Sequence, residues 1–261
     1  MAKVCQLFSG SSGNSIFISD EKAKFLVDAG VSAKRIEQAL LSIGESADEL
    51  TAIFVTHEHT DHIQGLRVLA SRHSLPVFTS EAVLARLYID GKINDKVNAL
   101  PISENMELEG AEIIPFMLSH DSVECWGYRF NIGGRAISVC TDTGYIPISA
   151  KKAVPGSDLV FLESNHEVMM LENGPYPYIL KQRILSRKGH LSNTDSAAFS
   201  KELVGSGTTR IVLSHLSKEN NHPDIARLTT LTALEEAGFA HNRDFQLFVA
   251  KPQNEERAII L

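Results

Sequence analysis

The stretch IFVTHEHTDH, residues 53–62, passes directly from three apolar residues to a segment that holds three histidines and one aspartate. His57 and His59 stand at positions i and i+2, so on an extended segment both imidazoles point to one side and can share a metal ion. Asp61 and His62, at the start of a predicted helix, can reach a second ion. The alternative interpretation is a solvated polar loop, but chance rarely gathers four such residues within six positions.

Short apolar runs recur along the chain, and each one ends in a polar residue that can take part in chemistry. Continuous apolar runs are typical of buried strands that are covered on both faces. Because sheet proteins usually place their sites at strand ends, we expect these polar residues to lie together at one edge of the sheet. The runs are residues 25–27 before Asp28, 53–55 before Thr56, 113–118 before Ser119 and His120, 137–140 before Thr141 and Asp142, 159–162 before Glu163, and 211–213 before Ser214 and His215.

Helical patterns separate these runs, and strands interleaved with helices predict a layered α/β domain. Pro223 suits the first turn of the last helix, and Gly238 stands just past its end. No composition shift marks a linker, so we expect residues 1–261 to form a single domain. The predicted helices cover residues 32–43, 61–73, 80–88, 176–187, 193–204 and 223–237.

The composition excludes several classes of protein. The chain has 261 residues, of which 43% are apolar and 22% charged, which excludes a disordered or fibrous protein. Its 32 acidic residues outnumber 25 basic ones, giving a net charge of −7, so any binding of nucleic acid needs a local basic patch or a bound metal. Three widely spaced cysteines argue against a disulfide framework or a thiolate zinc site.

The chain shows no sign of a membrane segment or a nucleotide cofactor. The N-terminus has no long apolar run, and nowhere do about 18 apolar residues follow one another. We therefore expect a soluble, cytoplasmic protein that does not contact a membrane. Residues 9–15, SGSSGNS, lack the GxxxxGK[ST] pattern of a nucleotide-binding loop. This segment is either a phosphate-cradling loop or a tight turn between two N-terminal strands.

The pattern HxHxDH after an apolar strand resembles the signature of the metallo-β-lactamase superfamily. The match continues through Asp28, His120, Asp142 in TDTG, and His215 in LSHLS, so it covers most of the chain. The resemblance implies a four-layer αβ/βα sandwich with two mixed sheets and a dinuclear metal site at one edge of the sheets.

A finer pattern resembles the YycJ/WalJ-type subfamily, which is associated with DNA exonuclease activity. The combination of motifs is specific to that subfamily, although no single motif is. Cys125 and Trp126 depart from the pattern, which has a proline and an aliphatic residue there. The matching motifs are residues 9–15, His120-Asp121, 162–166 (LESNH), 174–177 (GPYP), 189–193 (GHLSN) and 215–221 (HLSKENN).

The resemblance also implies roles for individual residues. Asp28 would brace the HxHxDH loop by hydrogen bonding. Asp142 would bridge the two ions, and His-rich ligation admits zinc, while the aspartates admit manganese or iron. The first ion would be held by His57, His59 and His120, and the second by Asp61, His62 and His215. His166 and His190 are alternatives to His215 as ligands of the second ion.

The implied reaction is hydrolysis of a phosphodiester by a 5′→3′ DNA exonuclease. Two neighbouring dications repel each other, so a bridging carboxylate and a bridging hydroxide lower the cost of placing them together. The same pair acidifies the bridging water toward neutral pH and so creates the nucleophile. Asp61 could orient this hydroxide and accept its proton.

Residues after the predicted strand at 159–162 have two interpretations each. His190 could contact a substrate phosphate or protonate the leaving oxygen, or it could simply belong to the cap of the following helix. Ser192 and Asn193 could offer donors to an anion at that helix N-terminus, or Ser192 could act only as the cap. Glu163 and His166 could brace the metal shell or belong to a satisfied polar loop.

Residues 181–188 carry the best candidate for a surface that binds a nucleic-acid strand. Lys181, Arg183, Arg187 and Lys188 place four positive charges within eight residues, with no acid among them. The alternative interpretation is a solvated helix face. Tyr176, Tyr178 and Trp126 could stack on bases, although packing is the commoner role of such residues.

Two other functions remain open from the sequence. The first is hydrolysis of a small ester, lactone or cyclic phosphodiester, since one metal platform hosts many reactions and the acidic net charge suits a small substrate. The second is a non-catalytic regulatory protein with a structural metal. Structural zinc sites are closed by four protein ligands, whereas seven ligands for two ions favour open positions for water.

Overall fold

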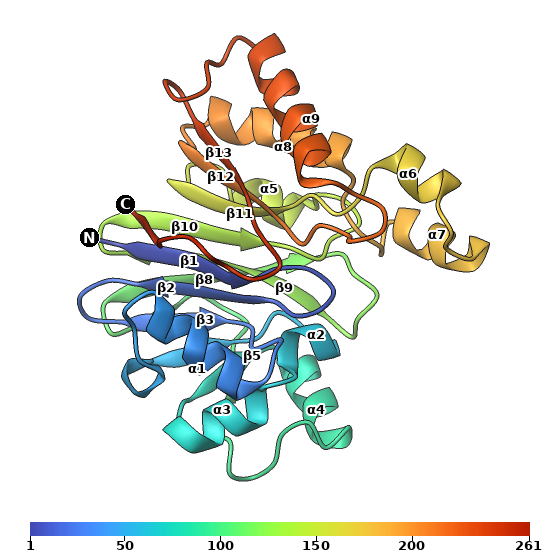
Figure 1. Cartoon of the computed structure of the whole chain (residues 1–261). Helices are drawn as coiled ribbons and strands as arrows, with labels where there is room; N and C mark the ends of the chain where they lie inside the picture. Colours follow the sequence, from blue (N-terminus) through green and yellow to red (C-terminus); the bar gives the residue numbers. More distant parts are fainter.

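The computed structural model, which describes residues 1–261, shows two mixed β-sheets packed face to face, with helices on both outer faces (Figure 1). Each sheet has seven strands. The predicted four-layer sandwich is therefore confirmed. The first sheet has the order β14-β1-β2-β3-β4-β5-β6, with β1 (Lys3–Phe8), β2 (Ser15–Ser19), β3 (Lys24–Val27), β4 (Ala52–Phe54), β5 (Val77–Thr79), β6 (Ala99–Pro101) and β14 (Ile259–Ile260).

The second sheet repeats the plan of the first. Its order is β13-β12-β11-β10-β9-β8-β7, and β10 to β13 are parallel while β7 to β10 are antiparallel. In the first sheet β3 to β6 are likewise parallel. The strands are β7 (Met106–Leu108), β8 (Ala111–Leu118), β9 (Cys125–Ile132), β10 (Arg135–Cys140), β11 (Leu159–Glu163), β12 (Arg210–Ser214) and β13 (Gln246–Val249).

Helices cover the outer face of each sheet, and one pair projects beyond the body. In Figure 1, α1, α3 and α4 lie below the first sheet, α5, α8 and α9 lie on the second, and α6 and α7 extend to one side. None of the helices has the length and apolar character needed to cross a lipid bilayer. The helices are α1 (Ala33–Ser42), α2 (Thr60–Ile63), α3 (Leu66–His73), α4 (Glu81–Ile89), α5 (Ile148–Ala153), α6 (Val168–Asn173), α7 (Tyr178–Leu185), α8 (Asn193–Gly205) and α9 (Pro223–Glu236), with a 3₁₀ turn at Ala47–Glu49.

The predicted elements agree with the structure except where backbone contacts intervene. The helix predicted over 61–73 is divided into α2 and α3 at Gly65, where a Cβ atom would lie 2.2 Å from the carbonyl oxygen of Val31. The helix predicted over 176–187 begins only at Tyr178, because prolines disfavour a helical conformation in the residues before them. The run at 113–118 is not covered on both faces, since Met117 of β8 is exposed next to the edge strand β7.

Aromatic side chains between the two sheets anchor the strand that leads to the histidine segment. The ring centroid of Phe54, at the end of β4, lies 5.5 Å from that of Phe25 in the same sheet and 5.2 Å from that of Phe130 in the other. Its ring also contacts Phe78 and Tyr128. Such pairs stabilise beyond the area they bury. The residues that follow Phe54 therefore leave the core from a fixed position.

Three loops meet at Gly30 with no room for a side chain. The amide of Gly30 donates to the carbonyl of Asn14 at 2.8 Å, and the amide of Asn14 donates to the carbonyl of Asp61 at 2.8 Å. A Cβ atom on Gly30 would lie 1.7 Å from the Asp61 oxygen. Glycine is therefore required for the histidine segment to dock against the loop between β1 and β2.

We expect Gly30→Ala to lower the free energy of unfolding by at least about 2 kcal/mol, because the added methyl overlaps backbone atoms that cannot move independently. Urea denaturation measures this difference. The control is Gly205→Ala in α8, where the methyl meets nothing closer than 3.8 Å and alanine raises helix stability. Equal stability of the two variants would contradict the argument.

Candidate metal centre

The ends of the central strands deliver the predicted ligands to one edge of the sandwich. Asp28 follows β3, Asp142 comes two residues after β10, and His215 follows β12. All three adopt left-handed backbone conformations, with φ values of 63°, 63° and 58°. Such conformations are uncommon for residues other than glycine and cluster at functional sites. The strands thus turn sharply where their side chains enter the site.

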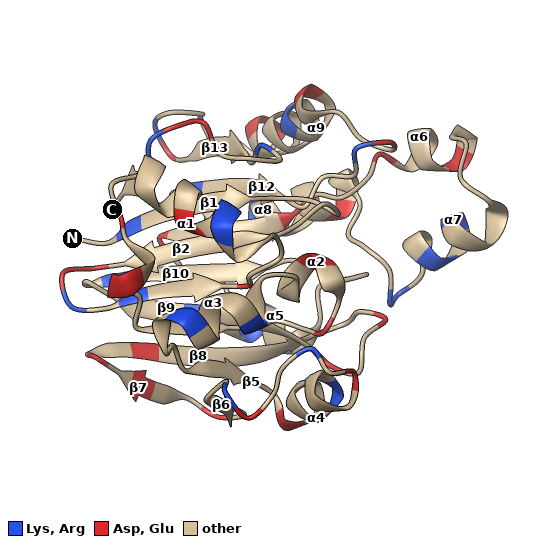
Figure 2. Ribbon diagram, turned by 60° about the horizontal axis from the view of Figure 1, so that its bottom comes forward, with Lys and Arg blue, Asp and Glu red and all other residues tan.

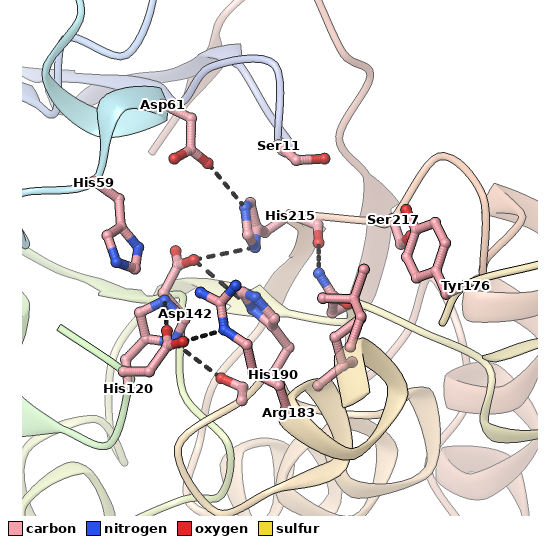
Figure 3. Close-up of a pocket in the computed structure, with 15 residues that line it drawn as sticks. Ser11, His59, Asp61, His120, Asp142, Tyr176, Arg183, His190, His215 and Ser217 are labelled. Carbon is pink, nitrogen blue, oxygen red and sulfur yellow. Dashed lines mark hydrogen bonds and ion pairs between the residues drawn. The ribbon is translucent and has the colours of Figure 1, made fainter. Parts of the chain in front are cut away.

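The seven predicted ligands form two groups joined by Asp142. Within each group one ligand atom from every residue lies within 4.8 Å of the others, and Asp142 makes such a group with His57 and His62, one residue from each set. Figure 3 shows His59 and His120 on one side of Asp142 and Asp61 and His215 on the other. The two sets are His57, His59 and His120, and Asp61, His62 and His215.

Unpaired buried atoms show that these residues fit metal ions. Nε2 of His57, Nε2 of His215 and Oδ2 of Asp142 are all buried, and none has a hydrogen-bond partner. A buried polar atom without a partner is costly, so native proteins rarely keep one. Here three such atoms lie in the overlapping groups of one cluster. Two divalent cations, each held by imidazoles and a carboxylate, would satisfy all three.

The charge state of the histidines reflects the carboxylates around them. Burial lowers the pKa of His62, but Asp142, Asp28 and Asp61 together outweigh burial and raise it to about 9. Burial and the neighbouring imidazoles hold the pKa of His57 well below its usual range, so His57 is neutral, the form that binds a metal. The carboxylates around His62 therefore attract positive charge, which suits the binding of a cation by Asp61, His62 and His215.

Asp28 braces the histidine segment and does not belong to either ligand group. Its carboxylate accepts hydrogen bonds from Nδ1 of His62 at 2.7 Å and from the amide and hydroxyl of Thr56. Because Nδ1 of His62 is engaged, its Nε2 points toward Asp142, 3.5 Å from the nearer oxygen. A carboxylate behind a metal-binding histidine fixes both its tautomer and its orientation.

Glu163 plays the same part on the opposite side and links two histidines. Its buried carboxylate accepts from Nδ1 of His190 at 2.7 Å and from Nδ1 of His215 at 2.9 Å. It also accepts from the amide of Thr143 at 2.8 Å and that of Leu191 at 3.2 Å. Burial raises the pKa of Glu163, but His190 and His215 outweigh it and leave the pKa well below the usual range. Glu163 is therefore an anion that holds both imidazoles.

An open cavity of about 230 Å³, here called the metal pocket, gives access to these residues. Seven predicted site residues line it, together with Tyr176, which was considered for base stacking (Figure 3). The seven are His59, Asp61, His120, Asp142, Arg183, His190 and His215. Several other residues that line it have no predicted role, although all but two of them fall in the motifs that resemble the YycJ/WalJ-type subfamily. These residues are Ser11, Asp121, Asn165, Leu180, Ile184, Gly189 and Ser217.

Three residues predicted near the site lie outside the metal pocket. His166 is buried with a pKa lowered to about 4 by burial, and it joins no ligand group. Ser192 caps α8 by accepting from the amide of Asp195, and its hydroxyl donates to the Asp195 carboxylate. Asn193 is fully buried and bonded to Ser164 and Asn221. This placement does not support substrate contacts by Ser192 or Asn193, since their polar atoms already have internal partners.

The predicted basic residues lie on α7 and the loop after it, part of a projecting arm formed by residues 168–188 (Figures 1 and 2). Arg183 lines the metal pocket and forms an ion pair with Asp121. Arg187 lies over the ring of Tyr145, 3.9 Å from its centroid. Lys181 donates to the carbonyl of Glu172, and Lys188 is exposed. Of the four, only Arg183 lines the metal pocket.

The three aromatic residues considered for base stacking differ in position. Tyr176 lines the metal pocket, and Tyr178 is exposed on the first turn of α7. Trp126 lies on β9, where its indole N–H donates to Glu124 and its side chain packs against the core between the sheets. Tyr176 and Tyr178 are therefore placed to meet a ligand at the arm, whereas Trp126 has a packing role.

Comparison with known proteins agrees with this geometry. A family model described as a beta-lactamase superfamily domain matches residues 23–216. The chain belongs to the metallo-β-lactamase superfamily. The exodeoxyribonuclease YycJ of Bacillus anthracis is 36% identical over 249 residues, covering 95% of this chain and 94% of that protein. The exodeoxyribonuclease WalJ of Streptococcus pneumoniae is 36% identical over 250 residues, covering 94% and 93%.

A solved structure with low sequence identity shares the fold. Zinc-bound PqqB from Methylobacterium extorquens aligns with a TM-score of 0.70 at 16% sequence identity, covering 100% of both chains. The resemblance to the superfamily and to its YycJ/WalJ-type members, predicted from the HxHxDH segment and the motifs around it, is confirmed by these findings.

We expect Asp142→Ala to reduce the metal content of the purified protein below two ions per chain, because this carboxylate joins the two ligand groups. Inductively coupled plasma mass spectrometry measures the content after zinc loading and desalting. The matched control is Asp90→Ala, which removes an exposed aspartate at the end of α4. Retention of two tightly bound ions by the Asp142 variant would contradict the bridging position.

Proposed function

We propose that the chain is a two-metal phosphodiester hydrolase that degrades DNA as an exonuclease from 5′ ends. One observation carries the hydrolase part: two ligand groups joined by Asp142 lie beside an open pocket instead of in a closed core. The two relatives named exodeoxyribonuclease, each aligned over nearly the whole chain, support DNA as the substrate. The 5′→3′ direction rests on the resemblance to their subfamily.

The proposed cofactors are two divalent ions, zinc or manganese, with iron as a further candidate. The imidazole-rich set suits zinc, and the set containing Asp61 also admits manganese or iron. When bound, the ions would lower the pKa of water and neutralise negative charge on the phosphate. His57, His59, Asp61, His62, His120, Asp142 and His215 would hold them.

Asp61 is the proposed proton acceptor from the attacking water. Its side chain is partly exposed toward the metal pocket, and its Oδ2 lies 3.8 Å from Nε2 of His215. Burial raises the pKa of Asp61, but the neighbouring imidazoles of His215 and His62 outweigh burial and leave the pKa well below the usual range. The carboxylate is therefore ionised at neutral pH and available to orient the water and take up its proton.

His190 is the proposed proton donor to the leaving oxygen. Nδ1 of His190 is fixed by Glu163 at 2.7 Å, so Nε2 is the nitrogen left to meet a substrate in the metal pocket. Glu163 holds the ring in one orientation, so Nε2 is the atom that would pass a proton to the leaving oxygen. Glu163 thus positions His190 and the proposed ligand His215 with one carboxylate.

The arm is the proposed contact surface for the strand. Its basic residues stand out in a chain of net charge −7, and neutralising backbone phosphates requires a local cationic patch. Arg183 lines the pocket, Lys181 lies on the same helix, and Arg187 and Lys188 directly precede the pocket residue Gly189. Tyr176 and Tyr178 add ring faces on which bases can stack.

A second candidate function is hydrolysis of a small ester, lactone or cyclic phosphodiester. The modest volume of the metal pocket, about 230 Å³, favours it because a small molecule would fill the space. The salt dependence of turnover separates the two functions. Strand binding releases counterions and weakens steeply with salt, whereas a small neutral ester responds little.

We expect Asp61→Ala and His59→Ala to remain folded and to lose hydrolysis of both bis-p-nitrophenyl phosphate and DNA by at least about 10³-fold, since each removes a proposed metal ligand. Circular dichroism checks the fold, and release of p-nitrophenol or labelled nucleotide reports the activity. His73→Ala is the control, because His73 pairs only with Glu37 and Asp48 on the outer helical layer. Full activity in a variant verified to be metal-free would refute the hydrolase proposal.

We expect Lys188→Glu to lower kcat/KM for single-stranded DNA relative to that for bis-p-nitrophenyl phosphate by about tenfold, because a repelling charge replaces an attracting one. Lys201→Glu, which reverses an exposed charge on α8, should leave the ratio unchanged. Equal losses on both substrates would count against the arm as a strand-binding surface.

DNA labelled at the 5′ or the 3′ end, with a panel of added metals, reports the direction of degradation.

A further inference from the structure

A second cavity of about 270 Å³ adjoins the metal pocket, and the proposed reaction makes no use of it. Ser11 and Ser217 line both cavities, so the two share a wall. Figure 3 shows both serines at the edge of the metal pocket beside His215 and away from His120. We call this space the serine cavity, after Ser11, Ser12 and Ser217, which line it together with Lys218.

The charge of the lining changes sign between the two cavities. Asp61, Asp121 and Asp142 line the metal pocket, whereas no carboxylate lines the serine cavity. Lys218 forms no ion pair within the chain, and the hydroxyls of Ser11 and Ser12 have no hydrogen-bond partner in it. Two acids stand close to lining residues in the chain, Glu219 beside Lys218 and Asp224, whose carboxylate lies 3.5 Å from Nδ1 of His222; both are exposed, and neither lines the cavity. These donors suit an anion with several oxygen atoms.

The rest of the lining combines apolar and polar residues. Leu216, Pro223, Ala250 and Pro252 contribute hydrocarbon, and Ser9, Gly10, Asn221 and His222 complete the lining. The volume lies just below the range of about 300–1,000 Å³ typical of sites for drug-sized ligands. A cavity of this size that is lined by both donors and hydrocarbon matches one phosphate with the sugar attached to it.

The loop that lines the serine cavity is held at a fixed place relative to the metal centre. The hydroxyl of Ser9 accepts from the amide of His215 at 2.8 Å, and the amide of Asn14 donates to the carbonyl of Asp61 at 2.8 Å. Within the loop, the side chain of Asn14 accepts from the amide of Gly10 at 2.9 Å. The cavity is thus tied to two proposed ligands through short hydrogen bonds.

We propose that the serine cavity binds a second phosphate of the DNA strand, with its deoxyribose, while the neighbouring phosphodiester occupies the metal pocket. This inference rests on the proposed function, because only a substrate with more than one phosphate can fill both cavities. Lys218 and the hydroxyls of Ser11 and Ser12 contact the phosphate oxygens, and the apolar lining residues pack against the sugar. By binding this second phosphate, the serine cavity determines which phosphodiester bond of the strand lies at the metal centre.

The test compares dinucleotides that differ by one phosphate. The wild-type holoenzyme should hydrolyse pdTpdT or dTpdTp, which carry a second phosphate at one end, about tenfold faster in kcat/KM than dTpdT. Lys218→Gln combined with Ser12→Ala should reduce this preference to near one. Both side chains are exposed, so the variant is expected to fold. Lys201→Gln on α8 is the control and should keep the preference.

A second measurement does not depend on hydrolysis. In zinc-loaded, isotope-labelled protein, inorganic phosphate should shift the amide resonances of Ser12 and Lys218, which line only the serine cavity, and Lys218→Gln should abolish the shift of Ser12. If the dinucleotides are cleaved without any preference, or if Ser12 and Lys218 do not respond to phosphate, the subsite is refuted and the nuclease proposal stands. If no dinucleotide or DNA is cleaved but these resonances respond, the nuclease proposal fails and the anion subsite is retained.

Discussion

The unpaired buried atoms of His57, Asp142 and His215 impose the constraint around which the rest of the site is built. Each would be destabilising in a dry environment, and together they are stable only where positive charge can be placed among them. Asp142 belongs with His57 and His62 and so stands between the two ligand groups. This edge of the sandwich is therefore suited to binding cations.

Two buried carboxylates keep the imidazoles aimed at this point. Asp28 fixes His62 from the first sheet, and Glu163 fixes His190 and His215 from the second. Each carboxylate occupies Nδ1. Nε2 of His62 then lies beside Asp142, while His190 and His215 line the metal pocket. Asp28 orients one histidine, His62, which is a proposed metal ligand. Glu163 orients two, and one of them, His190, belongs to neither predicted set of metal ligands. The same anion therefore orients a proposed metal ligand and a proposed proton donor, which couples their positions.

The surroundings of the centre divide by charge. Acidic residues gather in the metal pocket, basic residues lie on the arm, and hydroxyls with Lys218 line the serine cavity. A strand of nucleic acid needs a cationic path on both sides of the reacting phosphate, since the pocket itself is acidic until its ions are bound. In the proposed function, the arm supplies that path on one side of the metal pocket, and the serine cavity supplies it at the wall formed by Ser11 and Ser217.

The sequence by itself determined the layered α/β fold, the histidine segment and most helix positions, because periodicity, capping and ligand spacing act over about ten residues. Ser192 as the cap of α8 and Pro223 as the start of α9 are examples. Only the tertiary structure decided that Glu163 holds two histidines, that Asn193 faces inward, and that Ser9 bonds to His215 beside a second cavity. These contacts join residues 27 to 206 positions apart, and strand order and register, which no local pattern encodes, determine which of them form.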